Sequence, residues 1–421
     1  MAVVYNFGIY VFTLGLHLAA LFYPKARKWV AGRRNWRRRY RLAFQKTSPV
    51  LWVHAASLGE FEQGRPIIER CRQQFPDWQI VLTFFSPSGF EVRHHYAQAD
   101  FIAYLPADTP RNAVDFLDII QPDAVVFVKY EFWFNYLRAL RGRGIPTILV
   151  SALFRAQQPF FQPWGGFWRE GLRAFPHFFV QNESSAQLLG SIGFQNVTVA
   201  GDTRVDRVLE IAAAAPGNGL VESFLRRDLA APILIIGSAW EADETILASV
   251  LQNQQTTNNW KLIVAPHEPS EKNVQRLLRY PQAVRYSQAI PETLSTARLL
   301  VIDNVGMLNT LYRYGTVAYI GGGFGAGIHN TLEPAAFGLP IIFGPKYTKF
   351  EEACAFVARG AAFVVRDSAE LGVVLQQLQS PEFYRRASQA ALDFLEENRG
   401  ATQQVVAFLE QLSTTLPRST K

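Results

Sequence analysis

The sequence predicts an α/β protein of two doubly wound, Rossmann-like domains facing each other across a cleft. Its 421 residues suit two domains of ordinary size. A composition with 49% hydrophobic and 18% charged residues is typical of globular proteins with sizeable cores. From residue 47 onward, short apolar runs alternate with helical stretches. Runs of this kind are typical of parallel strands buried on both faces, so the expected order is strand and helix in alternation.

The apolar runs place thirteen strands in two series, separated by the Ala-, Pro- and Gly-rich stretch Ile211–Leu220. The first series is Leu51–Ala55, Ile80–Thr83, Phe101–Leu105, Ala124–Val128, Thr147–Val150, Phe178–Val180 and Val197–Ala200. The second is Ile233–Ile236, Leu262–Val264, Leu299–Ile302, Val317–Ile320, Ile341–Phe343 and Ala362–Val365. We therefore expect a leading segment 1–46, a first domain 47–210 and a second domain 211–421. A last helix, about Ala401–Leu416, is expected to pack back on the first domain.

The chain opens with Val3–Tyr23, a run of 21 residues without a charge. About 20 apolar residues span a bilayer core. Asn6 and His17 interrupt the run, so a helix lying in the membrane interface is the alternative. A cleaved signal peptide would carry its charges before the apolar run, and here they follow it. We expect an uncleaved membrane-anchor helix.

A basic segment follows, with ten Lys or Arg between Lys25 and Lys46 and no Asp or Glu in residues 1–46. The rest of the chain holds 42 − 10 = 32 basic and 35 acidic residues, a net charge near −3, which disfavours a nucleic-acid partner. Positive charge beside an apolar segment marks the cytoplasmic side and attracts anionic lipid headgroups. The aromatic residues of this segment are expected in the headgroup zone, namely Tyr23, Trp29, Trp36 and Tyr40. Deleting residues 1–46 is expected to leave both domains whole.

No metal or other cofactor is expected. Cys71 and Cys354 lie far apart and are predicted to be free thiols, and no Cys-x-x-Cys, His/Cys cluster or Asp-x-Asp pair occurs. Activity should therefore survive EDTA.

The block Gly321–Ala336 carries five glycines directly after the expected strand Val317–Ile320, and it is expected to open a helix. Glycines let the backbone approach a ligand closely, and a helix amino terminus favours a phosphate. The spacing matches neither the Rossmann dinucleotide fingerprint nor a Walker loop. Asn330 is a natural N-cap that Glu333 would complete as a capping box. The functional alternative is that Glu333 accepts hydrogen bonds from ribose hydroxyls.

A second motif, His54-Ala55-Ala56-Ser57-Leu58-Gly59-Glu60, follows the first expected strand. A carboxylate on this first loop could take a proton from an acceptor hydroxyl. The alternative is a favourable acid in the first turn of a helix.

An ordered set of motifs over nearly the whole chain resembles the 3-deoxy-D-manno-octulosonic acid (Kdo) transferase family, which has the glycosyltransferase B fold. Besides the apolar and basic leading segment, the set comprises the motif 54–60, Ser86-Pro87-Ser88-Gly89, Tyr104-Leu105-Pro106, Glu131-Phe132-Trp133, Gly201-Asp202-Thr203-Arg204, Gly237-Ser238, Gly321–Ala336, Phe343-Gly344-Pro345 and Asn398-Arg399-Gly400.

The resemblance implies transfer of Kdo from CMP-Kdo to a lipid A precursor (lipid IVA), with inversion. It also implies a location at the cytoplasmic face of a bacterial inner membrane. Glu60 matches the general base of the family, and Glu131 and Arg204 match positions that stabilise the transition state. The implied CMP site comprises Pro266, His267, Gly306, Met307, Leu308, Asn330, Thr331, Leu332 and Glu333.

This chain departs from the family at three of these positions. His267 stands where Arg is frequent, Arg204 where Lys is common, and Met307 where Glu is common. The differences bear on individual CMP contacts more than on the reaction. From the residues themselves, Arg204 could also be a solvated residue between the domains. Two other functions stay open: a lipid glycosyltransferase that uses a uridine nucleotide sugar, and a membrane-tethered nucleotide-binding scaffold without activity.

Overall fold

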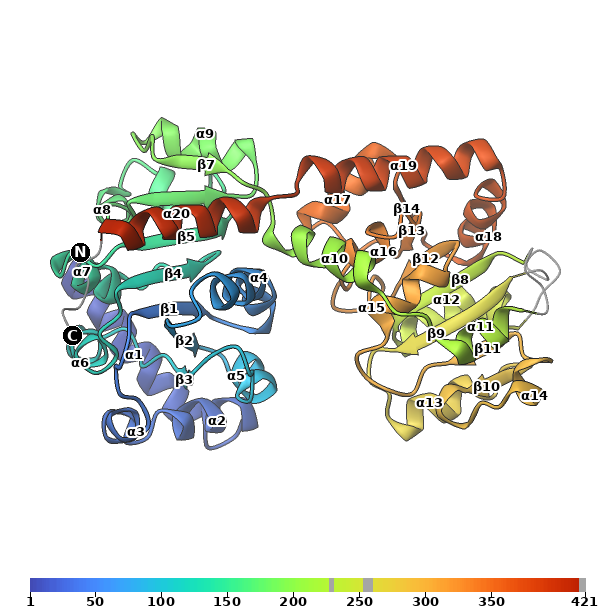
Figure 1. Ribbon diagram of the computed structural model, residues 1–421, viewed down its shortest axis with the longest axis horizontal. Coiled ribbons are helices and arrows are strands. Elements are labelled where there is room, and N and C mark those ends of the chain that lie inside the picture. Colours follow the sequence, from blue (N-terminus) through green and yellow to red (C-terminus); the bar gives the residue numbers. More distant parts are fainter. Residues whose placement is uncertain (227–230, 253–259, 416–421) are drawn as a thin grey trace. The chain divides into compact units, whose positions relative to one another are not determined.

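The computed structural model describes residues 1–226, 231–252 and 260–415 (Figure 1). It forms two compact units, Met1–Asp206 with Asn398–Lys421, and Arg207–Glu397. Each unit contains one parallel seven-stranded sheet. The predicted α/β class with two doubly wound domains is confirmed.

The sheet of the first unit has the strand order β3-β2-β1-β4-β5-β6-β7. Its strands are β1 (Val50–Ala55), β2 (Gln79–Phe84), β3 (Phe101–Tyr104), β4 (Ala124–Val128), β5 (Thr147–Ala152), β6 (His177–Val180) and β7 (Val197–Val199). Its helices are α1 (Ala2–Ala19), α2 (Pro24–Gly32), α3 (Trp36–Ala43), α4 (Leu58–Gln74), α5 (Pro87–Arg93), α6 (Pro110–Ile120), α7 (Phe134–Gly142), η1 (Pro159–Phe161), α8 (Gly166–Leu172), α9 (Glu183–Ser191) and α20 (Ala401–Thr415).

Both faces of this sheet are buried, because successive side chains of a strand point to opposite faces. In β1, Val50 and Trp52 join a core with α3, α6 and α7, whereas Leu51 and Val53 join a core with α4 and α20. This explains why the strands read as continuous apolar runs.

The sheet of the second unit has the order β10-β11-β9-β8-β12-β13-β14. Its strands are β8 (Ile233–Ala239), β9 (Lys261–Pro266), β10 (Ala283–Arg285), β11 (Leu299–Val301), β12 (Val317–Ile320), β13 (Ile341–Phe343) and β14 (Ala362–Val364). Its helices are α11 (Gly219–Leu225), α12 (Glu241–Leu251), α13 (Glu271–Leu277), η3 (Tyr286–Gln288), α14 (Pro291–Leu294), α15 (Leu308–Leu311), η4 (Tyr312–Tyr314), α16 (Leu332–Ala335), α17 (Glu351–Arg359), α18 (Ser368–Gln377) and α19 (Pro381–Glu397). Helix α10 (Thr203–Ala214) contains the boundary between the two units.

All thirteen expected strands are present, and β10 is a fourteenth that the apolar pattern did not predict. Its three residues are half-buried and end in Arg285, which pairs with Glu271 and Asp303. A short edge strand of this kind carries no continuous apolar signal.

The basic segment belongs to the core of the first unit, contrary to the expectation that it lies in the headgroup zone. Trp29, Trp36 and Tyr40 are 4%, 5% and 5% exposed, and Phe44 is 7% exposed. Trp36, Tyr40 and Phe44 pack in one cluster with the sheet. Deleting residues 1–46 would therefore open this core, so the expectation that both domains stay whole is wrong. Tyr23 is exposed at 66%.

Helix α1 contacts the first unit along one side. The Tyr5 hydroxyl donates to Asp108 Oδ2 at 2.6 Å, the Asn135 amide donates to Asn6 Oδ1 at 2.9 Å, and the rings of Phe12 and Phe85 stack. No residue of α1 is fully buried. Its length and composition would allow it to cross a membrane.

Helix α20 supplies Ala401, Val405, Val406 and Leu409 to the core of the first unit. Residues 398–421 accordingly group with that unit, and the second compact unit ends at Glu397. The helix ends at Thr415, and position 416 lies outside the described residues.

Candidate active site

Each sheet has a topological switch point, which is a pair of neighbouring strands whose connections leave toward opposite edges of the sheet. Ligands of open α/β sheets bind there, at the carboxyl ends of the strands. In the first unit this place lies between the neighbouring strands β1 and β4. The segment after β1 carries Glu60, and the segment after β4 carries Glu131. The two carboxylates therefore follow neighbouring strands at the same edge of the sheet.

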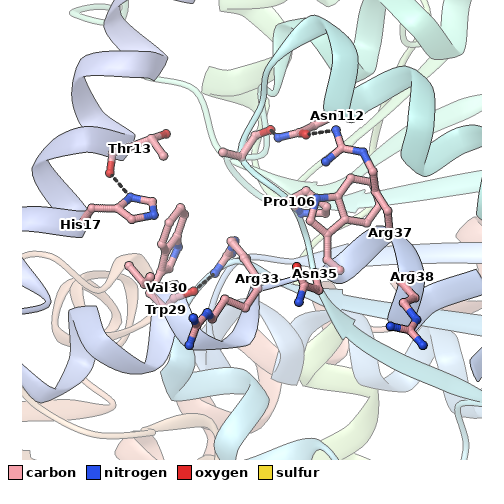
Figure 2. Close-up of a pocket in the computed structure, with 13 residues that line it drawn as sticks. Thr13, His17, Trp29, Val30, Arg33, Asn35, Arg37, Arg38, Pro106 and Asn112 are labelled. Carbon is pink, nitrogen blue, oxygen red and sulfur yellow. Dashed lines mark hydrogen bonds between the residues drawn. The ribbon is translucent and has the colours of Figure 1, made fainter.

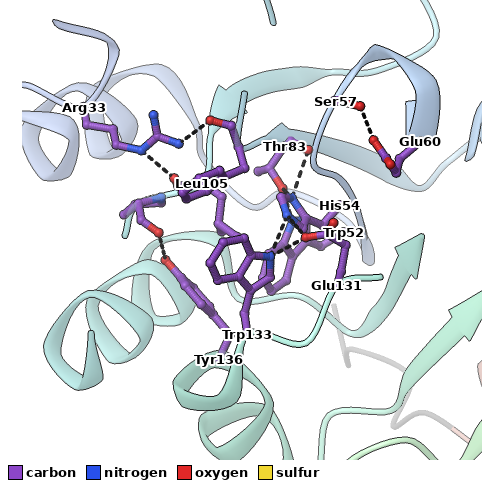
Figure 3. A network of polar contacts seen from close by, with 12 residues as sticks. Arg33, Trp52, His54, Ser57, Glu60, Thr83, Leu105, Glu131, Trp133 and Tyr136 are labelled. Carbon is purple, nitrogen blue, oxygen red and sulfur yellow. Dashed lines mark hydrogen bonds and ion pairs between the residues drawn. The ribbon is translucent and has the colours of Figure 1, made fainter. Parts of the chain in front are cut away.

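Glu131 is 5% exposed and lies in a polar cluster (Figure 3). His54 Nε2 lies 3.0 Å from Glu131 Oε2, and the indole N–H of Trp133 donates to the same oxygen. His54 is fully buried at 0% exposure, near the end of β1. Two side chains from different segments thus hold the buried carboxylate in one orientation.

Both ring nitrogens of His54 have hydrogen-bond partners. Nδ1 lies 2.8 Å from Thr83 Oγ1, which also accepts from the Trp52 indole at 2.7 Å, and 3.0 Å from the Thr83 carbonyl oxygen. Because the partner of Nε2 is a carboxylate, a proton on Nε2 is donated to Glu131. The chain Trp52, Thr83, His54, Glu131 connects the core of the sheet to the edge of the site.

Glu60 lies in the first turn of α4 and is partly exposed. Its carboxylate accepts a hydrogen bond from the Ser57 hydroxyl, so Ser57 is not a side-chain cap of the helix. In Figure 3, Ser57 and Glu60 lie to one side of the His54–Glu131–Trp133 cluster. Glu60 is thus more open to solvent than Glu131.

Arg204 lies at the start of α10, where Asp202 pairs with its guanidinium at 2.7 Å. Asp202 also accepts from the Gln63 amide at 3.0 Å, which ties this turn to α4 one helical turn beyond Glu60. Burial would raise the pKa of Asp202, but Arg204 and these hydrogen bonds more than offset it, so the pKa lies below its usual range. Arg204 is therefore a paired side chain in this structure.

Near the carboxyl ends of β4, β5 and β8, three residues other than glycine have a left-handed backbone conformation. They are Lys129 with φ 70°, Ser151 with φ 49° and Ser238 with φ 53°. The register of the ladder shifts at Ser151 in β5 and at Ser238 in β8. Bulges and strained backbone of this kind collect beside functional sites. No pattern in the sequence indicates these bulges or the left-handed backbone.

In the second unit, the corresponding place lies between β8 and β12, where the glycine-rich block leaves β12. A Cβ at Gly321 would lie 2.2 Å from the Ser238 carbonyl oxygen, and one at Gly323 would lie 2.5 Å from Gly344 N. The glycines are needed where this loop passes other backbone segments.

Asp243 anchors this loop, a role that the sequence did not suggest. Its side chain is fully buried and accepts from the N–H groups of Gly322 and Trp240, both at 2.9 Å, and from the Tyr319 hydroxyl at 3.1 Å. The sequence feature that could have indicated this role is the position of Asp243 in the acidic first turn of α12.

Next to the loop, Trp240, His267 and His329 form a stack of rings. Trp240 and His267 lie 4.1 Å apart and His267 and His329 lie 4.4 Å apart between centroids, and the Trp240 indole donates to His329 Nε2 at 3.0 Å. Burial and the neighbouring His267 lower the pKa of His329 to about 4. The structure thus brings the expected His267 together with Trp240, which the sequence did not single out.

The expected capping box at Asn330 is wrong by one residue. Helix α16 has Thr331 as its N-cap, without a side-chain hydrogen bond from it. Asn330 Oδ1 accepts from the N–H of Leu332 at 3.0 Å, and the Asn330 amide donates to Glu333 Oε1 at 3.0 Å. Asn330 and Glu333 are partly exposed, whereas Thr331 and Leu332 are 0% and 1% exposed. Side-chain contacts to a ligand are therefore open only to Asn330 and Glu333 among these four.

The remaining expected nucleotide positions lie on two segments. Pro266 ends β9 directly before His267. Gly306 has φ 93°, Met307 is the N-cap of α15, and Leu308 Cδ2 lies 3.1 Å from where a Cβ of Gly237 would be. Leu308 is thus near the carboxyl-terminal half of β8, while Gly306 is exposed. Within the described residues, no group of three or more His, Cys, Asp and Glu side chains is arranged to hold a metal ion.

Comparison with known proteins identifies a family and a fold. The model of the family "3-Deoxy-D-manno-octulosonic-acid transferase (kdotransferase)" matches residues 34–207. The chain is 26% identical to the 3-deoxy-D-manno-octulosonic acid transferase of Haemophilus influenzae, over 86% of each chain. It is 27% identical to that of Aquifex aeolicus, over 79% of this chain and 86% of the relative.

Solved structures with the same fold include a putative UDP-N-acetylglucosamine 2-epimerase from Listeria monocytogenes. Its TM-score is 0.61 at 12% identity, covering 88% of this chain and 98% of that one. A glycosyltransferase from Rickettsia africae has a TM-score of 0.55 at 10% identity, covering 87% and 99%. At these identities the likeness concerns the fold. Together with the ordered motifs and the two seven-stranded sheets, the sequence matches show that this chain is a glycosyltransferase similar to the 3-deoxy-D-manno-octulosonic acid transferases.

Proposed function

We propose that this protein transfers Kdo from CMP-Kdo to a lipid A precursor, with inversion, at the cytoplasmic face of a bacterial inner membrane. The observation that carries the proposal is the placement of Glu60 and Glu131 after the neighbouring parallel strands β1 and β4, in a chain similar to these transferases. A sugar hydroxyl is a poor nucleophile near neutral pH, so inverting transfer requires a base beside the acceptor.

Glu60 is the base in this proposal. Its carboxylate is partly exposed and held by the Ser57 hydroxyl, so it can reach an acceptor hydroxyl that arrives from solvent. Glu131, held by His54 and Trp133, has a fixed orientation suited to binding polar groups of the acceptor or of the transition state. Arg204 supplies positive charge for the departing anion, and it must share that charge with Asp202.

A lipid acceptor fits the surroundings of Glu131. A cavity of about 530 Å³ beside this residue is lined by Tyr5, Ile9 and Phe12 of α1. The rest of its lining is mainly aromatic and apolar: Tyr130, Phe132, Trp133, Phe134, Gln158, Pro159, Phe160 and Trp168. Apolar walls beside a carboxylate suit an acceptor with acyl chains and a sugar hydroxyl.

The donor is assigned to the second unit. The glycine-rich loop, the Trp240–His267–His329 stack and the partly exposed carboxylate of Glu333 offer backbone approach, ring surfaces and an acceptor for ribose hydroxyls. Stacking on aromatic rings suits the cytosine base of CMP, and the uracil base of a uridine nucleotide would stack equally well.

Thermal stabilisation by CMP and by UDP separates the two enzyme candidates. We expect CMP to raise the melting temperature at concentrations where UDP does not. A protein stabilised by UDP alone would contradict the CMP-Kdo assignment. A protein that binds CMP but never releases it from CMP-Kdo in the presence of lipid acceptor would favour the scaffold.

A further inference from the structure

The basic segment encloses a cavity of about 590 Å³ (Figure 2). It lies between α1, which contributes Thr13 and His17, and the segment α2–α3. Four arginines line it: Arg33, Arg34, Arg37 and Arg38. The remaining lining residues are Trp29, Val30, Asn35, Trp36, Pro106, Ala107 and Asn112, so the lining contains no carboxylate.

Arg33 is a half-buried cation without a carboxylate partner. Its guanidinium donates only to backbone carbonyl oxygens, those of Leu105 and Phe85 at 2.8 Å and Trp29 at 3.1 Å. Its carbon lies 3.9 Å from the centre of the Trp29 ring. Burial lowers the pKa of Arg33 to about 9, which measures how unfavourable this charge is without compensation. An anion in the cavity would supply the missing compensation.

The other lining groups are mostly donors as well. Arg37 is neutralised by Asp115, but within the described part of the chain Arg34 and Arg38 have no carboxylate at ion-pair distance. Both are exposed. The indole N–H of Trp29 is buried and has no acceptor among the described residues. Two guanidinium groups without a carboxylate partner, the half-buried guanidinium of Arg33 and one unpaired N–H therefore surround the same cavity.

The position beside α1 indicates what kind of anion fits. On α1, Leu14 and Leu18 are 62% and 59% exposed, and beyond its end Leu21 and Phe22 are 68% and 78% exposed. An anionic group that enters this cavity therefore has an exposed apolar surface next to it. We infer that the cavity is a binding site for the phosphate group of a membrane lipid, held by Arg34 and Arg38 over Arg33. The inference does not depend on the proposed catalytic residues.

The test uses two double variants with the same loss of charge. Arg34→Gln/Arg38→Gln removes two lining guanidinium groups. Lys25→Gln/Arg41→Gln removes two exposed charges of the same basic segment that do not line the cavity. If the segment only attracted an anionic surface diffusely, the loss of two positive charges would weaken binding by both variants alike. A built site would weaken the first variant selectively.

Binding of soluble dihexanoyl phosphatidic acid to the full-length protein is measured by calorimetry. We expect Arg34→Gln/Arg38→Gln to weaken it at least about tenfold and Lys25→Gln/Arg41→Gln to change it less than about twofold, with both melting temperatures near that of the wild type. Equal loss in both variants, or no binding to the wild type, would overturn the site. Should the first variant unfold, the single variants Arg34→Gln and Arg38→Gln replace it, each compared with Lys25→Gln and Arg41→Gln, and equal loss in all four would overturn the site.

Two further arms separate the possible sources of the phosphate. If the site takes the bulk phospholipid, Arg34→Gln/Arg38→Gln loses binding to phosphatidylglycerol vesicles while the KM for lipid acceptor in neutral detergent is unchanged. If it takes a phosphate of the acceptor, that KM rises. Stabilisation by inorganic phosphate equal to that by the lipid would show a free-phosphate site and contradict the lipid assignment.

Discussion

At the scale of single residues, Glu131 depends on His54 for its orientation. His54 is fully buried between Thr83 and Glu131, and its two ring nitrogens bond one to each. A buried carboxylate that loses its donor costs about 1–3 kcal/mol in free energy. We therefore regard His54 as a positioning residue for Glu131.

Two replacements of His54 separate its hydrogen bond to Thr83 from its hydrogen bond to Glu131. Gln places an amide near the Nε2 position and can still donate to Glu131, whereas the shorter Asn reaches only toward Thr83. We expect His54→Asn to lower kcat about 10- to 100-fold with little change in the KM for the donor, and His54→Gln to recover part of that loss. Steady-state kinetics on both variants measures this, and equal kcat values for Asn and Gln would contradict the positioning role.

The second prediction concerns Glu60. Gln keeps its size and can still hydrogen-bond Ser57, but it cannot accept a proton. General-base catalysis is typically worth roughly 10²–10⁴-fold, so we expect Glu60→Gln to lower turnover by that factor and to leave CMP affinity nearly unchanged. If Glu60 were only a favourable acid in the first turn of α4, its loss would cost about 0.3–1 kcal/mol of stability and little turnover.

A matched control is Glu62→Gln on the same helix, since Glu62 pairs with Arg93 and Arg65. Turnover, CMP binding and melting temperature are measured on both variants. Turnover of Glu60→Gln within a few-fold of the wild type would exclude Glu60 as the base.

His329 gives a pH dependence to the second unit. Its pKa of about 4 lies below the ordinary 6.5, so between these pH values the folded state binds fewer protons than the unfolded state. The free energy of unfolding therefore falls as the pH drops from 6.5 to about 4. We expect a contribution of about 1–2 kcal/mol, because partial exposure screens part of the shift. Melting curves of His329→Gln should show a shallower loss on acidification than the wild type, while the exposed His94→Gln should follow the wild type.

At the scale of elements, the strands could be predicted and the leading segment could not. Strands such as β4 and β12 match their expected bounds. A parallel strand that is buried on both faces is a continuous apolar run, so the ends of the run mark the ends of the strand. The basic segment was interpreted by charge, but its structure depends on distant partners. Arg33 bonds to the carbonyl of Leu105, 72 residues away, and Arg37 to Asp115, 78 residues away. No local pattern contains such contacts.

The same limit applies to the site. Glu60 and Glu131 could be located by their motifs, because each follows a recognisable strand. The supporting residues could not, because Asp243 and Trp133 differ from other acids and aromatics only in what they contact. The left-handed backbone at Lys129 and Ser238 likewise arises from tertiary contacts.

Because α3 packs in the core of the first unit and no residue of α1 is fully buried, we expect different results for two truncations of the leading segment. Removing residues 1–22 takes away α1 and keeps Trp36, Tyr40 and Phe44 in the core. Removing residues 1–46 takes away these rings, each worth about 3–5 kcal/mol when truncated in a core. We expect the first truncation to be folded and released from membranes by salt, and the second to be aggregated or molten.

Circular dichroism melts and sedimentation with membranes measure both outcomes. The full-length Trp36→Ala variant is the control, and it should lose several degrees in melting temperature. Equal melting temperatures for the two truncations would mean that α2 and α3 do not belong to the core.

At the scale of the whole molecule, the chain combines an apolar helix, a basic cavity, a pair of carboxylates after neighbouring strands and a glycine-rich loop with stacked rings. Each feature suits one part of a transfer from a soluble nucleotide sugar to a lipid. Whether the protein catalyses this transfer therefore decides between an enzyme and a scaffold.

The most direct test incubates full-length protein with CMP-Kdo and a lipid A precursor in the presence of excess EDTA, and weighs the lipid product by mass spectrometry. We expect a mass increase by one or more Kdo units, with one CMP released per unit, for the wild type, and almost none for Glu60→Gln. An unchanged lipid mass with the wild-type protein, or a product formed only from a uridine nucleotide sugar, would contradict it.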